Sequence, residues 1–148
     1  YIVFCYFLLF VYNAIGQTTV NSTQTAEFYV KNVLLGPGVE VANIKHKGMI
    51  CGLGQFDADP KIIGVRSGLI LSTGHVDSII GPNNDKGFTS MGSFPESKWL
   101  ITQIRKGDRD LNRLCHRRTI DITVIEFDFV PTKNVLEFNY VFASEEYT

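Results

Sequence analysis

The sequence predicts a mainly β protein, an antiparallel β-sandwich of the jelly-roll type with one or two short helices. Three observations lead to this prediction. Apolar and polar side chains alternate over residues 119–130 and 135–143, which is the period of a strand with one buried face. Glycine-rich turns separate several short apolar segments. The clearest spacing of an amphipathic helix lies within residues 25–35.

Length and composition fit one globular domain. The chain has 148 residues, 45% of them apolar and 20% charged, with a net charge of -1. This balance argues against an acidic disordered chain and against a wholly basic protein that binds nucleic acid. Three cysteines are too few for a disulfide-dense mini-protein, and they are not spaced as a zinc site.

The first 16 residues predict a signal peptide. Residues 1–12 are apolar or aromatic without a charge, and small residues follow at Ala14 and Gly16. A transmembrane helix needs about 20 apolar residues, so the mature chain is expected to have no membrane span. The alternative is a buried strand or helix, but the density of aromatic residues argues against it. We therefore expect a secreted or cell-surface protein in an oxidising compartment.

The remaining chain is expected to form a flexible leader over residues 17–24 and one domain over residues 25–148. In the domain, the spacing first predicts a helix over 25–35. Thr25 can cap it, Glu27 suits the positive end of its dipole, and Gly36–Gly38 ends it. One apolar stripe comprises Ala26, Tyr29, Val30, Val33 and Leu34. We expect the domain to continue beyond Thr148.

Short strands are predicted next. They are expected at residues 39–43, 49–53 and 62–73, with a turn at 56–60 and a break at Ser67–Gly68. Residues 74–93 are rich in Gly, Asn, Asp and Ser and predict a long surface loop.

Residues 119–130 form the strongest predicted strand. Its apolar phase slips by one residue at Val124–Ile125, which predicts a β-bulge there. After a four-residue turn, residues 135–143 are expected to form the antiparallel partner strand. The apolar face of that partner comprises Leu136, Phe138, Tyr140 and Phe142.

Five segments resemble the amino-terminal half of the choice-of-anchor L domain. They are Phe28–Val41, Ser67–Gly81, Gly107–Leu111, Val124–Pro131 and Leu136–Tyr147, and LILSTG and VFASEEY are the most specific blocks. The resemblance implies an exported bacterial surface protein of the Bacteroidota type. Members of the family often carry adhesion repeats and a sorting segment for type IX secretion. The family has no established biochemical activity, so no catalytic residues carry over.

Four carboxylates form a candidate calcium site. They are Asp108, Asp110, Glu145 and Glu146. Ca²⁺ takes six to eight oxygen ligands, often from loop carboxylates. In the alternative interpretation, Asp108 caps a helix over 110–115 and the glutamates are solvated or paired with Arg113 or Arg117. A complete Asp-x-Asp-x-Asp-Gly loop is missing from the sequence, so the second interpretation is favoured.

The cysteines and the aromatic residues each leave two interpretations open. Cys51 and Cys115 either form a disulfide or remain two separate buried thiols. Phe88, Phe94 and Trp99 either stack on a sugar ligand or cover the end of the core. The second interpretation of the aromatic residues is favoured.

Charge is segregated near the C-terminal end. Residues 98–118 hold seven basic side chains against two acidic ones, and residues 119–148 hold six acidic side chains against one basic. The basic segment is a candidate surface for anionic glycans or nucleic acid. Because no aromatic stacking platform is interleaved with it, we expect the two segments to neutralise one another instead.

Signals of catalysis are weak. Ser72, His75 and Asp77 supply the residue types of a triad, but within six residues, whereas triad members normally converge from separate segments. We therefore expect a non-enzymatic exported module for adhesion or extracellular ligand binding. Its expected partner is a glycan or protein surface rather than nucleic acid. The alternatives are a carbohydrate-binding accessory module of a secreted enzyme and a fragment of a secreted hydrolase.

Overall fold

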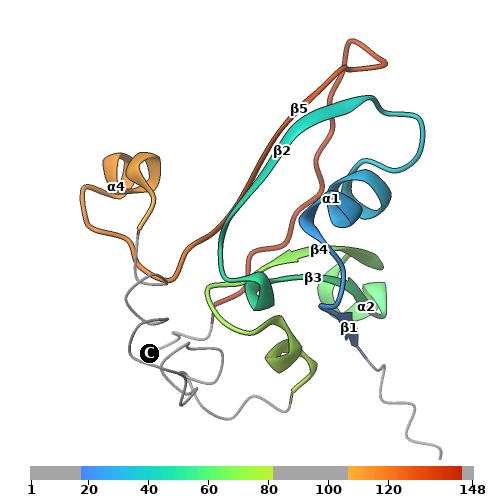
Figure 1. The fold of residues 1–148 in the computed structure, drawn as a ribbon. Coiled ribbons are helices and arrows are strands. Elements are labelled where there is room, and N and C mark those ends of the chain that lie inside the picture. The colour runs from blue at the N-terminus through green and yellow to red at the C-terminus, as the bar shows by residue number, and fades with distance from the viewer. Residues whose placement is uncertain (1–17, 82–106, 145–148) are drawn as a thin grey trace, which may run out of the picture.

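The computed structural model describes residues 18–81 and 107–144, which form two antiparallel sheets with short helices (Figure 1). One sheet has the order β1-β3-β4, with β1 Thr19–Asn21, β3 Leu53–Asp57 and β4 Ser67–Leu71. The other pairs β2 Val41–Gly48 with β5 Thr123–Phe129. This architecture confirms the predicted fold class.

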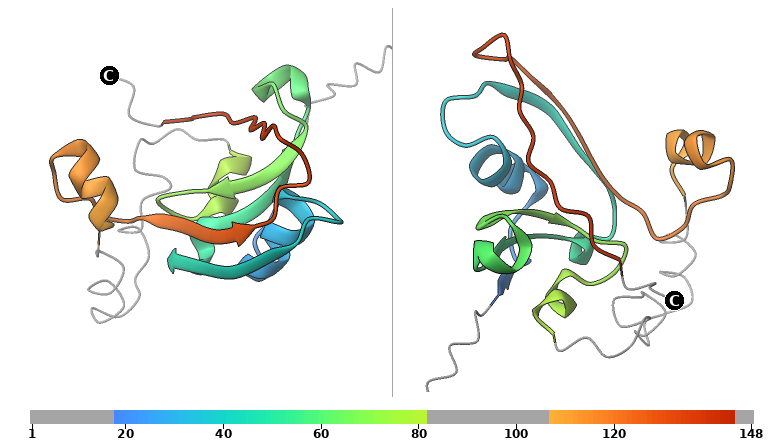
Figure 2. Two further views of the ribbon diagram at one scale, coloured as in Figure 1. Left: turned by 90° about the horizontal axis from the view of Figure 1, so that it is seen from above. Right: turned by 180° about the vertical axis from the view of Figure 1, so that it is seen from behind.

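The helices of the described residues are short. They are α1 Ala26–Tyr29, its π-helical continuation η1 Val30–Leu34, the 3-10 helices η2 Ile50–Gly52 and η3 Val76–Ile80, and the α-helices α2 Pro60–Ile63 and α4 Arg109–Cys115. In the two further views, α4 stands apart from both sheets (Figure 2). No helix within the described ranges is long and apolar enough to cross a membrane.

The predicted helix over 25–35 is confirmed. The Thr25 hydroxyl accepts a hydrogen bond from the Phe28 N–H at 3.1 Å and so caps α1. The helix ends at Leu34, and the backbone then turns at Gly36 (φ 73°) and Gly38 (φ 91°), where glycine carries no Cβ penalty.

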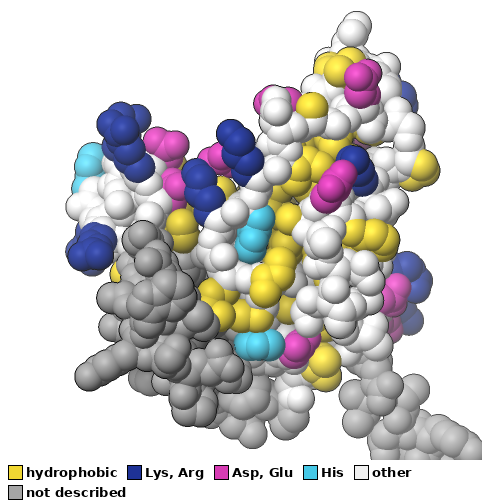
Figure 3. All heavy atoms as spheres, in the orientation of Figure 1, with side chains coloured by type: hydrophobic (Ala, Val, Ile, Leu, Met, Phe, Trp, Pro, Cys, Tyr) yellow, Lys and Arg dark blue, Asp and Glu magenta, His cyan; other side chains and the backbone are white. Residues whose placement is uncertain are grey.

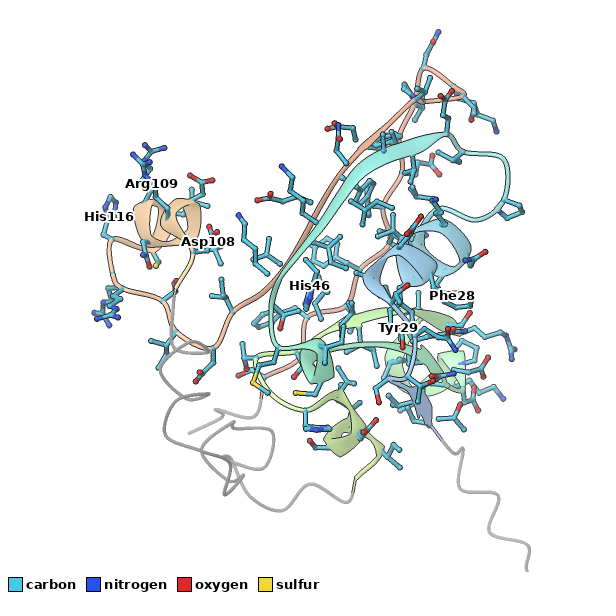
Figure 4. All side chains as sticks on the ribbon, in the orientation of Figure 1. Phe28, Tyr29, His46, Asp108, Arg109 and His116 are labelled. Atoms are coloured by element: carbon cyan, nitrogen blue, oxygen red, sulfur yellow. The ribbon has the colours of Figure 1, made fainter. Side chains whose placement is uncertain are left out.

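The core is built around this helix. Its fully buried side chains are Tyr29, Val30, Leu53 and Val76, with Ala58 2% exposed. Helix α1 contacts both β2 and β3, and η1 contacts β4, so the helix joins the two sheets. The Tyr29 hydroxyl donates to Asn21 O at 2.7 Å and accepts from the Gln24 N–H at 3.2 Å (Figure 4). The apolar stripe therefore positions a tyrosine that also holds the segment after β1.

The β-bulge lies in β2 and not at Val124–Ile125. Pairing runs continuously past those two residues, and the register shifts between Ala42 and Lys45, where two residues of β2 oppose Phe127. Asn43 accommodates the bulge at φ 53°, a left-handed conformation that asparagine tolerates. The phase slip has another cause: β5 begins only at Thr123, two residues after the left-handed Asp121.

The hairpin predicted from residues 119–143 is wrong. The partner of β5 is β2, and residues 135–143 follow β5 without forming a strand (Figure 1, red). Alternation defines the two faces of a segment but not the strand beside it. The large apolar side chains there are more than half exposed: Val135, Leu136, Phe138, Tyr140, Val141 and Phe142.

Two local predictions also change. The strand expected at 49–53 is the η2 turn followed by β3, which extends to Asp57. The strand expected at 62–73 begins as α2, because the Asp59 carboxylate accepts from the Lys61 N–H and Pro60 occupies the first helical turn. Strand β4 follows at Ser67. The predicted signal peptide over 1–16 lies outside the described residues, as does most of the predicted surface loop.

Candidate functional site

A helical arm, residues 107–119, carries the most distinctive group of functional side chains in the described residues. Asp108 caps it by accepting from the backbone N–H groups of Asp110 and Leu111, at 2.9 and 3.1 Å. The Leu111 and Asp110 N–H groups, in that order, are the main causes that lower the pKa of Asp108. The cap fixes the first turn of α4 and keeps its carboxylate ionised.

The base of the arm is closed by polar side chains. The Asn112 Oδ1 accepts from both the Thr119 N–H and the Thr119 hydroxyl, and the same hydroxyl accepts from the Asp108 N–H at 3.0 Å. Gly107 is required here, because a Cβ at that position would lie 2.1 Å from Thr119 O. These bonds join the two ends of the arm to each other.

Lys47 ties the arm to the β2–β5 sheet. Its Nζ donates to Glu126 Oε1 at 2.6 Å and lies 3.6 Å from Asp108 Oδ2. The hydrogen bond to Glu126 is the largest of the interactions that raise the pKa of Lys47. In Figure 4 the labelled Asp108 lies on the side of α4 that faces the sheet, whereas Arg109 and His116 extend away from it.

The arginines of the arm are exposed. They are Arg109, Arg113, Arg117 and Arg118. Figure 3 shows basic side chains gathered on α4. We expected this segment and residues 119–148 to neutralise one another, but within the described ranges no carboxylate of residues 119–144 forms an ion pair with these arginines. The nearest acidic partner is Asp110, whose Oδ1 lies 3.7 Å from Arg113 Nη1.

The structure describes two of the four side chains of the predicted calcium site. Asp108 acts as the N-cap that the alternative interpretation describes, and Asp110 is exposed beside Arg113. Glu145 and Glu146 lie outside the described residues. The described ranges contain no group of three His, Cys, Asp or Glu side chains arranged to hold a metal, which leaves the four-carboxylate site a prediction.

The other predicted site residues are spread over the molecule. Cys51 is half-buried in η2 and Cys115 is exposed on α4, where its Sγ contacts Leu111 O at 3.0 Å. No disulfide joins the two cysteines in the structure, and their pairing in the exported protein stays a prediction. The three aromatic residues Phe88, Phe94 and Trp99 lie outside the described residues.

A surface groove was not predicted. It has a volume of about 500 Å³ and is lined by Gly64, Val65, Phe138, Asn139, Tyr140 and Val141. The turn after α2 forms one wall, and the extended segment after β5 forms the other. The alternating aromatic side chains over 138–142 include residues of one wall, but their pattern predicted the face of a strand. Gly64 and Val65 carry no signal that would have placed them opposite.

His46 on β2 is a half-buried side chain with one enclosed ring nitrogen. Its Nε2 is enclosed and has no hydrogen-bond partner, and burial lowers the pKa of its imidazole. It lies across from Ile125 in the register of β2 and β5, on the inward face of the sheet. His46 therefore belongs to the packing between the sheet and the rest of the domain.

The residues with triad chemistry have other contacts. The Ser72 hydroxyl accepts from the Gly74 N–H at 3.1 Å within a turn. Asp77 accepts from the Ser22 hydroxyl at 3.0 Å and lies 3.4 Å from His75 Nδ1. These contacts tie η3 to the end of β1.

Taken together, the geometry defines a two-sheet β domain with a basic helical arm and a surface groove that aromatic side chains help to line. The model of the choice-of-anchor L domain matches residues 18–148, so the chain belongs to the choice-of-anchor L family. No curated protein and no solved structure matches the chain. Membership of this family indicates a surface-associated domain of an extracellular or cell-surface protein.

Proposed function

We propose that the chain is a non-enzymatic, exported domain that binds an extracellular partner in adhesion. The observation that carries this proposal is its membership of a surface-associated family over residues 18–148. The proposed partner is a protein or glycan surface outside the cell.

The engagement of the acidic side chains supports binding rather than catalysis. Asp59 and Asp108 cap helices, Glu126 pairs with Lys47, and Asp128 accepts from the Asn43 amide at 2.6 Å. These carboxylates stabilise local structure through helix caps, an ion pair and an amide hydrogen bond.

The exposed apolar surface supports the same proposal. Phe138 is 57% exposed, Tyr140 85% and Phe142 82%, and the first two line the groove. Contiguous exposed apolar surface of this kind marks sites of contact with partners, where aromatic side chains are enriched.

Adhesion of coated beads tests the proposal. Beads that carry the full chain are expected to attach to immobilised extracellular matrix and mucin more strongly than beads coated with albumin. The double variant Tyr140→Ser with Phe142→Ser is expected to attach less, because it removes apolar contact surface. Ile80→Ser is the matched control, since Ile80 is 54% exposed on η3.

Three outcomes would contradict the proposal. Attachment no stronger than that of albumin beads would remove the adhesive role. Release of reducing sugar from a polysaccharide by the full chain would support the hydrolase alternative. Binding of one short neutral oligosaccharide, without attachment to protein surfaces, would support the carbohydrate-binding accessory module.

A further inference from the structure

We propose that the arginine surface of the helical arm, Arg109, Arg113, Arg117 and Arg118, binds an anionic polysaccharide. The inference rests on the proposed function and names a ligand class for it.

The surface of the arm carries an excess of exposed positive charge. The four arginines lie on a short arm, and among the described residues only Arg113 forms an ion pair with a carboxylate, at 3.7 Å. That pair joins two side chains that are 70% and 79% exposed, and exposed pairs of this kind contribute little. Asp108 does not offset the arginines, because it faces the sheet and lies beside Lys47. The arm therefore presents positive charge to solvent.

The backbone that carries the four arginines is held in place. The Asn112–Thr119 bonds and the Asp108 cap fix the helix and its exit, and Lys47 ties the base to the sheet. A binding surface whose backbone is already ordered loses less conformational entropy when a ligand binds.

The positive charge of the arm comes from arginine and not from lysine. The planar guanidinium group donates two parallel hydrogen bonds to a sulfate or carboxylate, which a lysine ammonium cannot do. The segment 107–118 contains four arginines and no lysine. A polysaccharide that repeats its anionic groups can engage several of them at once, and each additional contact then forms intramolecularly.

The helix geometry favours a soluble polyanion over a lipid surface. Arg109 and Arg113 are four residues apart and share one face of α4. Leu111 and Leu114, 41% and 79% exposed, lie on the opposite face. Binding of a helix to a bilayer surface strengthens with the apolar area that it buries, and a seven-residue helix with two leucines offers little of that area.

Heparin serves as the probe in the test. The full chain is expected to bind immobilised heparin at low salt and to elute as the NaCl concentration rises, because salt screens exposed charges. The quadruple substitution Arg109→Gln, Arg113→Gln, Arg117→Gln and Arg118→Gln is expected to weaken binding by tenfold or more. A tenfold loss of affinity corresponds to about 1.4 kcal/mol of binding free energy.

Matched controls keep the result interpretable. Lys61→Gln with Lys133→Gln removes two exposed charges elsewhere and is expected to leave at least half of the affinity. The double substitution Arg117→Gln with Arg118→Gln removes the same number of charges as the lysine variant, from two residues that lie outside α4. It is expected to weaken heparin binding about tenfold. Unchanged far-UV circular dichroism would show that each variant remains folded.

Three results would overturn the inference. They are absence of heparin binding at low salt, equal losses in the lysine and arginine variants, and tighter binding to vesicles of anionic phospholipid than to heparin. The bead assay distinguishes failure of the polysaccharide inference from failure of the proposed function. Beads that attach without any affinity for heparin would contradict the polysaccharide inference alone, whereas beads that fail to attach would contradict the adhesive role.

Discussion

Removing one hydroxyl group from Tyr29 is expected to destabilise the domain measurably. The side chain is fully buried, and its hydroxyl joins α1 to the chain after β1 through Asn21 O and the Gln24 N–H. Tyr29→Phe keeps the ring and creates no large cavity, so the loss is confined to these two hydrogen bonds. It also leaves one carbonyl and one amide without their partner.

The magnitude follows from the two bonds. A net contribution of about 1 kcal/mol for each predicts that Tyr29→Phe lowers the free energy of unfolding by about 2 kcal/mol. Asn21 is exposed and Gln24 is half-buried, so water can replace part of the loss. The expected decrease in the free energy of unfolding is therefore between about 1 and 2 kcal/mol.

Urea unfolding of the full chain, followed by circular dichroism, measures this difference. Tyr140→Phe is the matched control, because Tyr140 is 85% exposed and its loss is expected to change the free energy by less than about 0.5 kcal/mol. Hydrogen exchange at the Gln24 amide should accelerate in Tyr29→Phe alone. Equal stability of the two variants, with unchanged exchange, would refute the role assigned to the Tyr29 hydroxyl.

Three further predictions concern pH, backbone geometry and calcium. Because burial lowers the pKa of His46 in the folded state, stability should be complete above pH about 6.5 and fall as the pH decreases below it. His46→Leu should flatten this slope in urea titrations, and an unchanged slope in this variant would contradict the prediction. Gly48→Ala should destabilise the domain more than Gly38→Ala. Both glycines have positive φ, but only at Gly48 would a Cβ lie 2.0 Å from a backbone oxygen. Thermal unfolding compares the midpoints of the two variants. The calcium hypothesis predicts that excess calcium raises the unfolding midpoint and that the double substitution Glu145→Gln with Glu146→Gln abolishes the shift. The favoured interpretation, in which Asp108 is a helix cap, predicts an identical midpoint in calcium and in chelator, and that result would eliminate the calcium site.

Helix 25–35 was predictable because its signals are local. The cap at Thr25, the stripe that contains Tyr29 and Val30, and the glycine stop all lie within 14 residues of the sequence. The change to π-helical geometry at Val30 was not predictable, since side-chain spacing barely distinguishes the two helix types.

Strand pairing was predicted less well, because the partner of β5 lies about 80 residues away in β2. The bulge at Asn43 shifts the inward positions of β2 from Val41 to Ile44 and His46, which hides the period of two. Residues 135–143 follow β5 directly and alternate clearly, so proximity in the sequence favoured the wrong partner. Where long-range contacts choose the pairing, periodicity alone cannot identify it.

The same distant pairing explains why the described carboxylates of residues 119–144 form no ion pair with the arginines of the arm. Segments 98–118 and 119–148 are adjacent and of opposite charge, so mutual neutralisation was the simplest expectation. Once β2 pairs with β5, however, Lys47 binds Glu126 at 2.6 Å and Asn43 binds Asp128 at 2.6 Å. Glu126 and Asp128 thus have partners on β2. In the described part of the chain the arginines keep their charge facing solvent, where an anionic ligand can reach them.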